Sequence, residues 1–185
     1  MYEIIAGVMS RSRFIYPART VATINIKGVD LWDVRWAPHH SYALNTGNFL
    51  TDPRHPRYIL ANRRWNQRTE PLWWNCLVAN SEGGNKKVVR GWLIRRSRVA
   101  ITDALKRKGY AHDGSRLSGS PADSEIGNLV GSAHIFGTSK LLRASGKEVS
   151  RQADLVVEGI EQKQKEAKAK RRFKAAGGKR NYKNI

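Results

Sequence analysis

The sequence predicts a small α+β domain in which two helices cover a mostly antiparallel sheet, followed by a basic C-terminal helix and tail. Three observations support this class. Short β-branched and aromatic stretches have strand patterning. Two later stretches space their apolar residues three and four apart, as amphipathic helices do. The resulting order, three strands, a helix, a strand and a helix, is typical of helices packed over one sheet.

The length and the charge pattern divide the chain into one domain and a tail. A chain of 185 residues suits a single core and is short for two full domains. We therefore expect one compact domain over residues 1–161, containing a long Arg/Trp-rich excursion at 29–71. Residues 162–185 form a basic tail that a partner would order.

The first predicted strand, Thr20 to Lys27, alternates around Ile24 and Ile26 and ends at Gly28. The stretch 29–71 then loses any clear period and contains four prolines, so we expect it to be irregular. The exception is a short helix around Tyr58 to Arg64. Loops of this length inside a compact domain are usually functional.

Two strand-like runs, Leu72 to Ala79 and Lys87 to Ile94, flank a Gly-rich polar turn. This arrangement predicts a β-hairpin over residues 72–94. Ser97 is then placed to cap a helix that runs to Lys108, and Gly109 would end that helix in a left-handed conformation.

The last two core elements are a strand and a long helix. Asn128 to Gly137 reads as a strand, with a helix as the alternative because Gly131 and Ser132 interrupt the pattern. The Ser145-x-x-Glu148 sequence is a capping box that opens the helix. An apolar stripe follows on its inner face: Val149, Ala153, Val156, Val157 and Ile160.

The charge balance points to an anionic partner. The chain has 34 Lys and Arg residues against 15 acidic residues, a net charge of +19. Such a surplus repels itself unless it is neutralised, and polyphosphate backbones neutralise it by releasing their own counterions. A membrane partner is not expected, because no apolar run approaches the roughly 18 residues of a spanning helix.

Three basic groups are the predicted RNA-binding residues. An excursion group consists only of arginines, whose flat guanidinium suits phosphate and bases: Arg54, Arg57, Arg63, Arg64 and Arg68. A second group follows the predicted hairpin and helix, where it would form one face with Arg90 beside Trp92: Lys86, Lys87, Arg90, Arg95, Arg96, Arg98, Lys106, Arg107 and Lys108. Ordinary solvated surface is the alternative for both groups.

The tail is the third group and has the strongest pattern. Ten basic residues stand against Glu166 alone, and two aromatic residues are available for stacking on bases. The members are Lys163, Lys165, Lys168, Lys170, Arg171, Arg172, Phe173, Lys174, Lys179, Arg180, Tyr182 and Lys183. A tail that only solubilises or targets the protein is the alternative.

The hypothesis that the protein is an enzyme depends on scattered acidic residues. A metal-dependent nuclease would need several acids to converge, and the candidates are Asp30, Asp33, Asp52, Glu70, Asp103 and Asp123. Metal binding by His39, His40 and His55 is disfavoured because adjacent histidines point apart in an extended chain. His134 is expected to be a satisfied core histidine. No phosphate-binding or dinucleotide motif occurs, so no cofactor, no metal and no catalytic residue is predicted.

The sequence is compatible with more than one cellular compartment. Cys76 is the only cysteine, which suits a reducing intracellular compartment, and we expect it to be buried and inert. Residues 1–23 resemble a mitochondrial transit peptide in composition, although Glu3 to Val8 also reads as a strand. Lys/Arg-rich runs also serve as nuclear import signals, so mitochondrial and nuclear or nucleolar locations are both open.

Together these features predict a non-enzymatic RNA-binding protein. The most specific form of this hypothesis is a structural component of a ribosome, mitochondrial or other, or of another ribonucleoprotein, with rRNA and neighbouring subunits as partners. A nucleic-acid-processing enzyme such as a metal-dependent nuclease is the alternative. A DNA-binding protein is a further alternative, weakened because no helix-turn-helix or zinc-finger pattern is evident.

Overall fold

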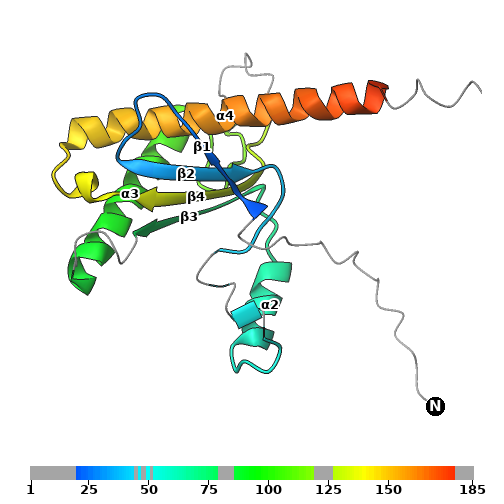
Figure 1. The fold of residues 1–185 in the computed structure, drawn as a ribbon, viewed down its shortest axis with the longest axis horizontal. Coiled ribbons are helices and arrows are strands. Elements are labelled where there is room, and N and C mark those ends of the chain that lie inside the picture. Colours follow the sequence, from blue (N-terminus) through cyan, green and yellow to red (C-terminus); the bar gives the residue numbers. More distant parts are fainter. Residues whose placement is uncertain are drawn as a thin grey trace, which may run out of the picture.

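A computed structural model of the chain describes residues 20–43, 46, 49–50, 52–78, 86–118 and 127–177. A four-stranded mixed sheet lies at its centre, with two long helices packed against it (Figure 1). The strands are β1 (Ala22–Ile24), β2 (Trp32–Ala37), β3 (Leu72–Val78) and β4 (Gly131–Gly137). The helices are α2 (Tyr58–Asn66), α3 (Lys87–Arg107), the short η2 (Ser139–Leu142) and α4 (Gly146–Gly177). The predicted α+β class is confirmed.

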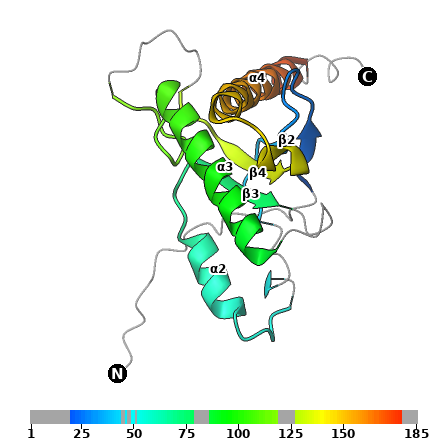
Figure 2. The ribbon, with the colours of Figure 1, turned by 90° about the vertical axis from the view of Figure 1, so that its left-hand side faces the viewer.

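The sheet has the spatial order β1-β2-β4-β3, so the last strand of the chain lies inside the sheet. It pairs antiparallel with β2 and parallel with β3, while β1 and β2 are antiparallel neighbours. Two of the three pairings are therefore antiparallel, as expected for a mostly antiparallel sheet. Viewed nearly along the strands, α3 and α4 lie together on one side of the sheet (Figure 2).

The predicted hairpin over residues 72–94 is wrong. Its first strand is β3, but Lys87 to Ile94 forms the first turns of α3. Parallel strands cannot be joined by a tight turn, and α3 supplies the crossover from β3 to its parallel partner β4. The run KVVRGWLI looks strand-like in isolation, yet Leu93 continues into Ser97 and Ile101 at helical spacing, and all three are buried.

Ser97 consequently has a different role from the predicted helix cap. It lies in the middle of α3, where its side chain is buried and its hydroxyl accepts a hydrogen bond of 3.0 Å from Trp32 Nε1. This bond joins α3 to β2. The helix ends where expected, because Gly109 follows it with a φ of +80°.

The excursion at 29–71 is more regular than predicted. Its short helix is confirmed as α2, but the excursion also contains β2, which the sequence analysis missed. In β2, Trp32, Val34 and Trp36 are buried, whereas Asp33 and Arg35 alternate with them and are only partly buried. This two-residue period was present in the sequence and was hidden by the surrounding prolines.

The predicted strand before α4 and the stripe on α4 are both confirmed. Gly131 to Gly137 is an inner strand of the sheet, β4, which makes the helical alternative wrong. The five residues of the stripe are buried against the sheet and α3, in one apolar cluster. Ser145 Oγ accepts a 3.2 Å hydrogen bond from the backbone N–H of Glu148, while the Glu148 carboxylate accepts bonds from Arg151 and Gln152. The Ser145 half of the capping box is therefore formed, whereas the Glu148 carboxylate binds other side chains of the helix.

Two buried glutamines of α4 fix the helix to the ends of two strands. Gln152 Oε1 accepts hydrogen bonds from the backbone N–H groups of Asp30 and Leu31, just before β2. Gln164 Oε1 accepts one from Val130 N–H, and its Nε2 donates to Asn128 O, just before β4. These bonds satisfy backbone groups that the sheet leaves unpaired, so they set the position of α4 over the sheet.

The residues assigned to the tail continue α4 as far as Gly177. Gln164 is buried beyond the predicted boundary at Glu161, and Ala167 still packs against the core. The rest of the helix projects beyond the sheet (Figure 1). A helix can extend here without an apolar stripe because its nucleating turns are already packed on the domain.

Gly131 is expected to be essential for stability. Its φ is +113°, and a Cβ at this position would lie 2.1 Å from the Ala37 carbonyl oxygen. A Gly131→Ala substitution should therefore lower the free energy of unfolding by several kcal/mol, from about 1–2 kcal/mol of left-handed strain plus the steric clash. Urea unfolding followed by circular dichroism measures the change.

Gly91 provides the matched control. It lies in α3, and a Cβ there meets nothing within 4 Å. Gly91→Ala should raise the free energy of unfolding by about 0.5–1 kcal/mol, because alanine is the better helix former. Equal effects of the two substitutions would contradict the close approach of β4 to the end of β2.

Candidate nucleic-acid interface

The arginines around α2 form an exposed cationic surface. Arg54, Arg57, Arg63 and Arg64 are exposed, and none of these four side chains forms an ion pair with another described residue. The helix itself has no buried residue, and Figure 1 shows it standing away from the sheet. We call these four residues the α2 arginine surface. Guanidinium groups without a counter-charge among the described residues are suited to binding phosphate.

Arg68, the fifth predicted residue of this group, has a different environment. It is half-buried and forms a 3.2 Å ion pair with Glu70. Its guanidinium carbon lies 4.8 Å from the ring centre of Trp65 and 4.7 Å from that of Trp73. Arg68 therefore helps to build an aromatic cluster between α2 and β3, where cation–π contacts orient the guanidinium.

The nine cations of the second group lie along α3 rather than on a hairpin face. Three of them are engaged within the protein. Arg96 donates to the carbonyl oxygens of Leu141 and Ala144, Arg107 pairs with Asp154, and Lys108 pairs with Glu158. Of the other six, Arg90 is half-buried, and five are exposed: Lys86, Lys87, Arg95, Arg98 and Lys106. Trp92 contacts Arg96 and not the expected Arg90. The guanidinium carbon of Arg96 lies 5.1 Å from the Trp92 ring centre.

The third group projects on α4. Lys163 pairs with Glu166 at 2.8 Å, and the following cations have no such partner among the described residues. Lys165, Lys168, Lys170, Arg171, Arg172 and Lys174 are exposed, and Phe173 between them is 82% exposed. We call residues 165–174 the α4 arm. Lys179, Arg180, Tyr182 and Lys183 lie outside the described residues.

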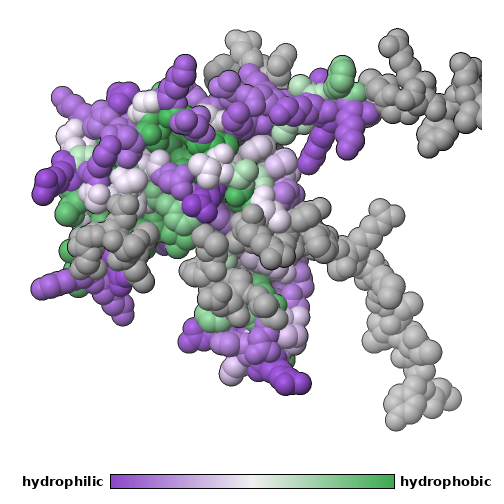
Figure 3. All heavy atoms as spheres, in the orientation of Figure 1, coloured by the Kyte–Doolittle hydropathy of each residue, from purple (hydrophilic) through white to green (hydrophobic). Residues whose placement is uncertain are grey.

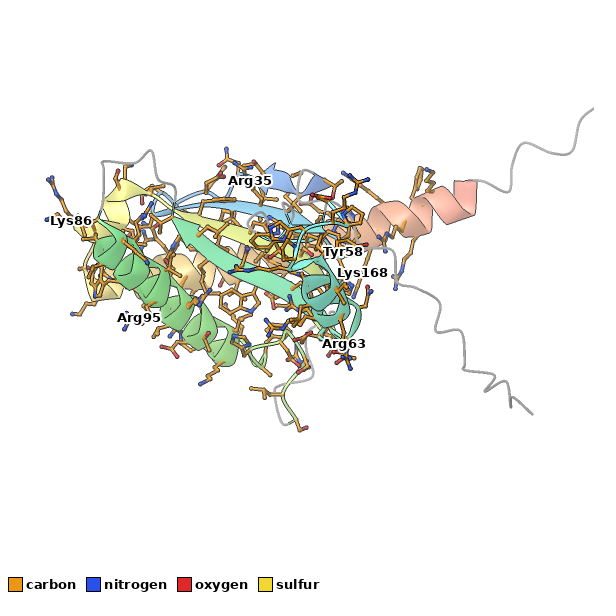
Figure 4. The ribbon with its side chains drawn as sticks, turned by 90° about the horizontal axis from the view of Figure 1, so that it is seen from below. Arg35, Tyr58, Arg63, Lys86, Arg95 and Lys168 are labelled. Carbon is orange, nitrogen blue, oxygen red and sulfur yellow. The ribbon has the colours of Figure 1, made fainter. Side chains whose placement is uncertain are left out.

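The three groups do not form one continuous surface. Lys86 and Lys168 are far apart along the molecule, whereas Tyr58 and Arg63 of α2 lie toward the Lys168 end (Figure 4). Hydrophilic side chains predominate on the visible surface of α2 and of the α4 arm, with hydrophobic atoms among them (Figure 3). Arg171 also lowers the pKa of His39, after the larger effect of burial, which places the arm near the segment that leaves β2.

The sheet face opposite α3 and α4 carries a polar row that the sequence analysis missed. The register aligns Thr23, Arg35, His134 and Asn75 across the four strands. Arg35 pairs with Asp33 at 3.2 Å, and its guanidinium carbon lies 4.6 Å from the Phe136 ring centre. The alternation in β2 was the only signal that could have located Arg35 on this face.

His134 is buried as expected, but it is not a fully satisfied core histidine. Its Nδ1 atom is buried and has no hydrogen-bond partner among the described residues. Burial lowers the pKa of the imidazole to about 4, and the positive charge of Arg35 contributes in the same direction. The side chain is therefore neutral at neutral pH.

Three of the acids considered for a nuclease have separate partners. Asp30 contacts Lys140 and Gln152, Asp33 contacts Arg35, and Glu70 contacts Arg68. Asp103 is exposed on α3, and Asp123 lies outside the described residues. Within the described ranges, no three His, Cys, Asp or Glu side chains are grouped so as to hold a metal ion.

The remaining predicted chemistry-bearing residues are dispersed. His40 stacks on Trp73 at 4.4 Å between ring centres and its Nε2 lies 3.0 Å from Pro71 O, while His39 Nε2 lies 2.8 Å from Thr20 Oγ1. His55 Nδ1 accepts from the Arg57 N–H. Cys76 is buried in β3 as expected, and burial raises the pKa of its thiol to about 12.

Comparisons with protein-family models, curated proteins and solved structures found no match to this chain. Of the helices in the described part of the chain, none has the length and apolar character needed to cross a membrane. We therefore infer function from the charge distribution and the geometry of the described residues.

The buried His134 predicts a specific pH dependence of stability. Its pKa of about 4 in the folded protein is below the ordinary 6.5, so the folded state disfavours the proton that the unfolded chain accepts. The contribution of the neutral His134 side chain to the free energy of unfolding is complete above about pH 6.5. It is lost progressively as the pH falls toward 4. At pH 5 this loss amounts to about 2 kcal/mol.

Urea unfolding of the wild type and of His134→Gln at pH 7.5 and pH 5 measures this effect. The variant cannot titrate at this position, so its free energy of unfolding should fall by about 2 kcal/mol less than that of the wild type. The other titrating groups are common to both proteins and cancel in the difference. Equal losses would show that His134 accepts a proton as readily in the folded state as in the unfolded chain.

Proposed function

We propose that this protein binds RNA through its basic surfaces and acts as a non-enzymatic structural component of a ribonucleoprotein. The observation that carries the proposal is the α2 arginine surface, four exposed guanidinium groups without acidic partners among the described residues, on a chain with a net charge of +19. Each phosphate neutralised by such a group releases counterions, which makes binding favourable and dependent on salt.

Two features favour RNA over duplex DNA. Arginine alone supplies the cations of the α2 surface, and guanidinium both pairs with phosphate in two-point contacts and stacks on unpaired bases. In addition, α3 and α4 are separated in the chain by β4 and pack side by side on the sheet, unlike the paired helices of a helix-turn-helix. The exposed Phe173 on the α4 arm offers a further stacking surface.

The α2 arginine surface and the α4 arm are the proposed contact regions. Both lie toward the same end of the long axis (Figure 4), on opposite sides of the sheet (Figure 1), while three of the nine α3 cations are engaged with other parts of the protein. A structural subunit of a ribosome, in mitochondria or elsewhere, is the specific assembly we propose. In such an assembly affinity comes from many phosphate contacts and not from a single pocket.

Three variants with the same loss of charge test this assignment. The first replaces Arg54, Arg57, Arg63 and Arg64 with Gln, and the second replaces Lys168, Lys170, Arg171 and Arg172 with Gln. The control replaces Lys86, Lys87, Arg95 and Lys106 with Gln. Binding of fluorescent structured RNA, single-stranded RNA and duplex DNA is measured over a salt series.

The first two variants should bind RNA more weakly than the control, and the slope of log affinity against log salt should become shallower by about 3 for four lost contacts to a single strand. Equal losses in all three variants would show that only net charge matters and would remove the assignment to α2 and α4. Tighter binding of duplex DNA than of either RNA would overturn the proposed RNA preference.

A further inference from the structure

A polar cavity of about 210 Å³ lies between α2, β3 and the segment that follows β2. Its walls include Ser41, Trp65, Arg68, Trp73, Asn75 and His134, with Arg98 of α3 contributing from another side. These residues come from separate parts of the sequence, and the sheet register brings Asn75 and His134 together as direct neighbours. Side chains crowd this space between α2 and the strands (Figure 4).

Most of the unsatisfied buried polar atoms in the described part of the chain belong to residues that line this cavity. Six buried side-chain nitrogen and oxygen atoms have no hydrogen-bond partner among the described residues, and five of these belong to residues that line this cavity. The five are Ser41 Oγ, Trp73 Nε1, Asn75 Nδ2, Asn75 Oδ1 and His134 Nδ1. Each buried group without a partner costs about 1–3 kcal/mol, so a folded protein rarely gathers several in one place without a use for them.

The unsatisfied atoms offer both donors and acceptors. Trp73 Nε1 can only donate, the Asn75 amide both donates and accepts, and the Ser41 hydroxyl can do either. Ser41, Trp73 and His134 are at most 2% exposed, so their polar atoms are held in place by packing. A ligand that satisfied these atoms would itself carry fixed donors and acceptors at short distances from each other.

The walls of the cavity favour a flat ligand attached to a negative group. The rings of Trp65 and Trp73 have their centres 5.0 Å apart, and the Arg68 guanidinium lies over both. No acidic side chain lines the cavity within the described residues, while Arg68 and Arg98 add positive charge. Its volume is below the roughly 300–1,000 Å³ typical of sites for drug-sized molecules, which suits a single ring system.

We propose that this cavity binds one unpaired nucleobase of RNA, with the polar atoms of Ser41, Trp73, Asn75 and His134 contacting the base edge. The planar guanidinium of Arg68, which lies over both indole rings, then stacks on the base face, as arginine does in other single-strand readers. The inference rests on the proposed RNA-binding function and adds base recognition to the phosphate contacts of α2 and α4.

Asn75→Leu is the decisive variant, because it keeps the size of the side chain and removes both of its polar atoms. Replacing an unsatisfied buried amide with an apolar group is expected to leave stability unchanged or to raise it, so the variant should fold. Asn66→Leu makes the same change at an exposed position on α2 and is the matched control. Urea unfolding of both variants checks that they fold.

The measurement compares a single-stranded oligoribonucleotide with an abasic oligomer of the same length and charge, using full-length protein at fixed salt. The wild type and Asn66→Leu should bind the oligomer that carries bases about 5- to 150-fold more tightly, the range expected for about one to three kcal/mol of base contact. Asn75→Leu should lose most of this preference and retain its affinity for the abasic oligomer.

The outcomes separate base recognition from RNA binding. Equal binding of both oligomers by the wild type would overturn the base site and leave the proposed RNA contacts intact. An unchanged base preference in Asn75→Leu would place recognition elsewhere. The protein could instead bind free nucleoside monophosphates in a way that depends on Asn75, and bind neither oligomer. The ligand would then be a free nucleotide, and both proposals about RNA would be overturned. Failure to bind any of these probes would overturn both as well.

Discussion

The position of β4 in the sheet determines the rest of the architecture. This strand follows β1, β2 and β3 in the sequence, yet it lies between β2 and β3 in the sheet. It is antiparallel to β2 and parallel to β3. The parallel pairing requires a crossover, which α3 provides, and α4 then packs beside α3 on the same face. Gly131 permits the close approach that this insertion needs at the end of β2, and Gln152 and Gln164 secure α4 over the two strand ends.

The one-sided packing of the helices gives the two faces of the sheet different chemistry. The covered face holds the apolar cluster, in which Val34, Ile135 and the α4 stripe meet. The opposite face carries the row from Thr23 to Asn75, and α2 lies against one end of it at the aromatic cluster. Polar atoms are thereby buried in a cavity whose walls do not satisfy them, and the stability lost there is consistent with a site shaped for a ligand.

The cations differ in availability even though the sequence presents them as similar runs. Cations on α3 face α4 in part, and Arg107 and Lys108 are paired with its acidic residues. Those on α2 and on the α4 arm extend from elements that project beyond the sheet, where acidic partners are sparse among the described residues. Local charge density in the sequence is therefore a poor measure of the charge that a phosphate backbone would meet.

The sequence by itself determined the α+β class, the inner face of α4, the strand at β4, the burial of Cys76 and the large positive charge, because periodicity and composition are local properties. It did not determine whether Lys87 to Ile94 would be strand or helix, since eight apolar and basic residues suit either, and the parallel partner β4 decided the matter. It also gave no indication that Ser41, Trp73, Asn75 and His134 would share one cavity, because only strand register and the placement of α2 bring distant residues together.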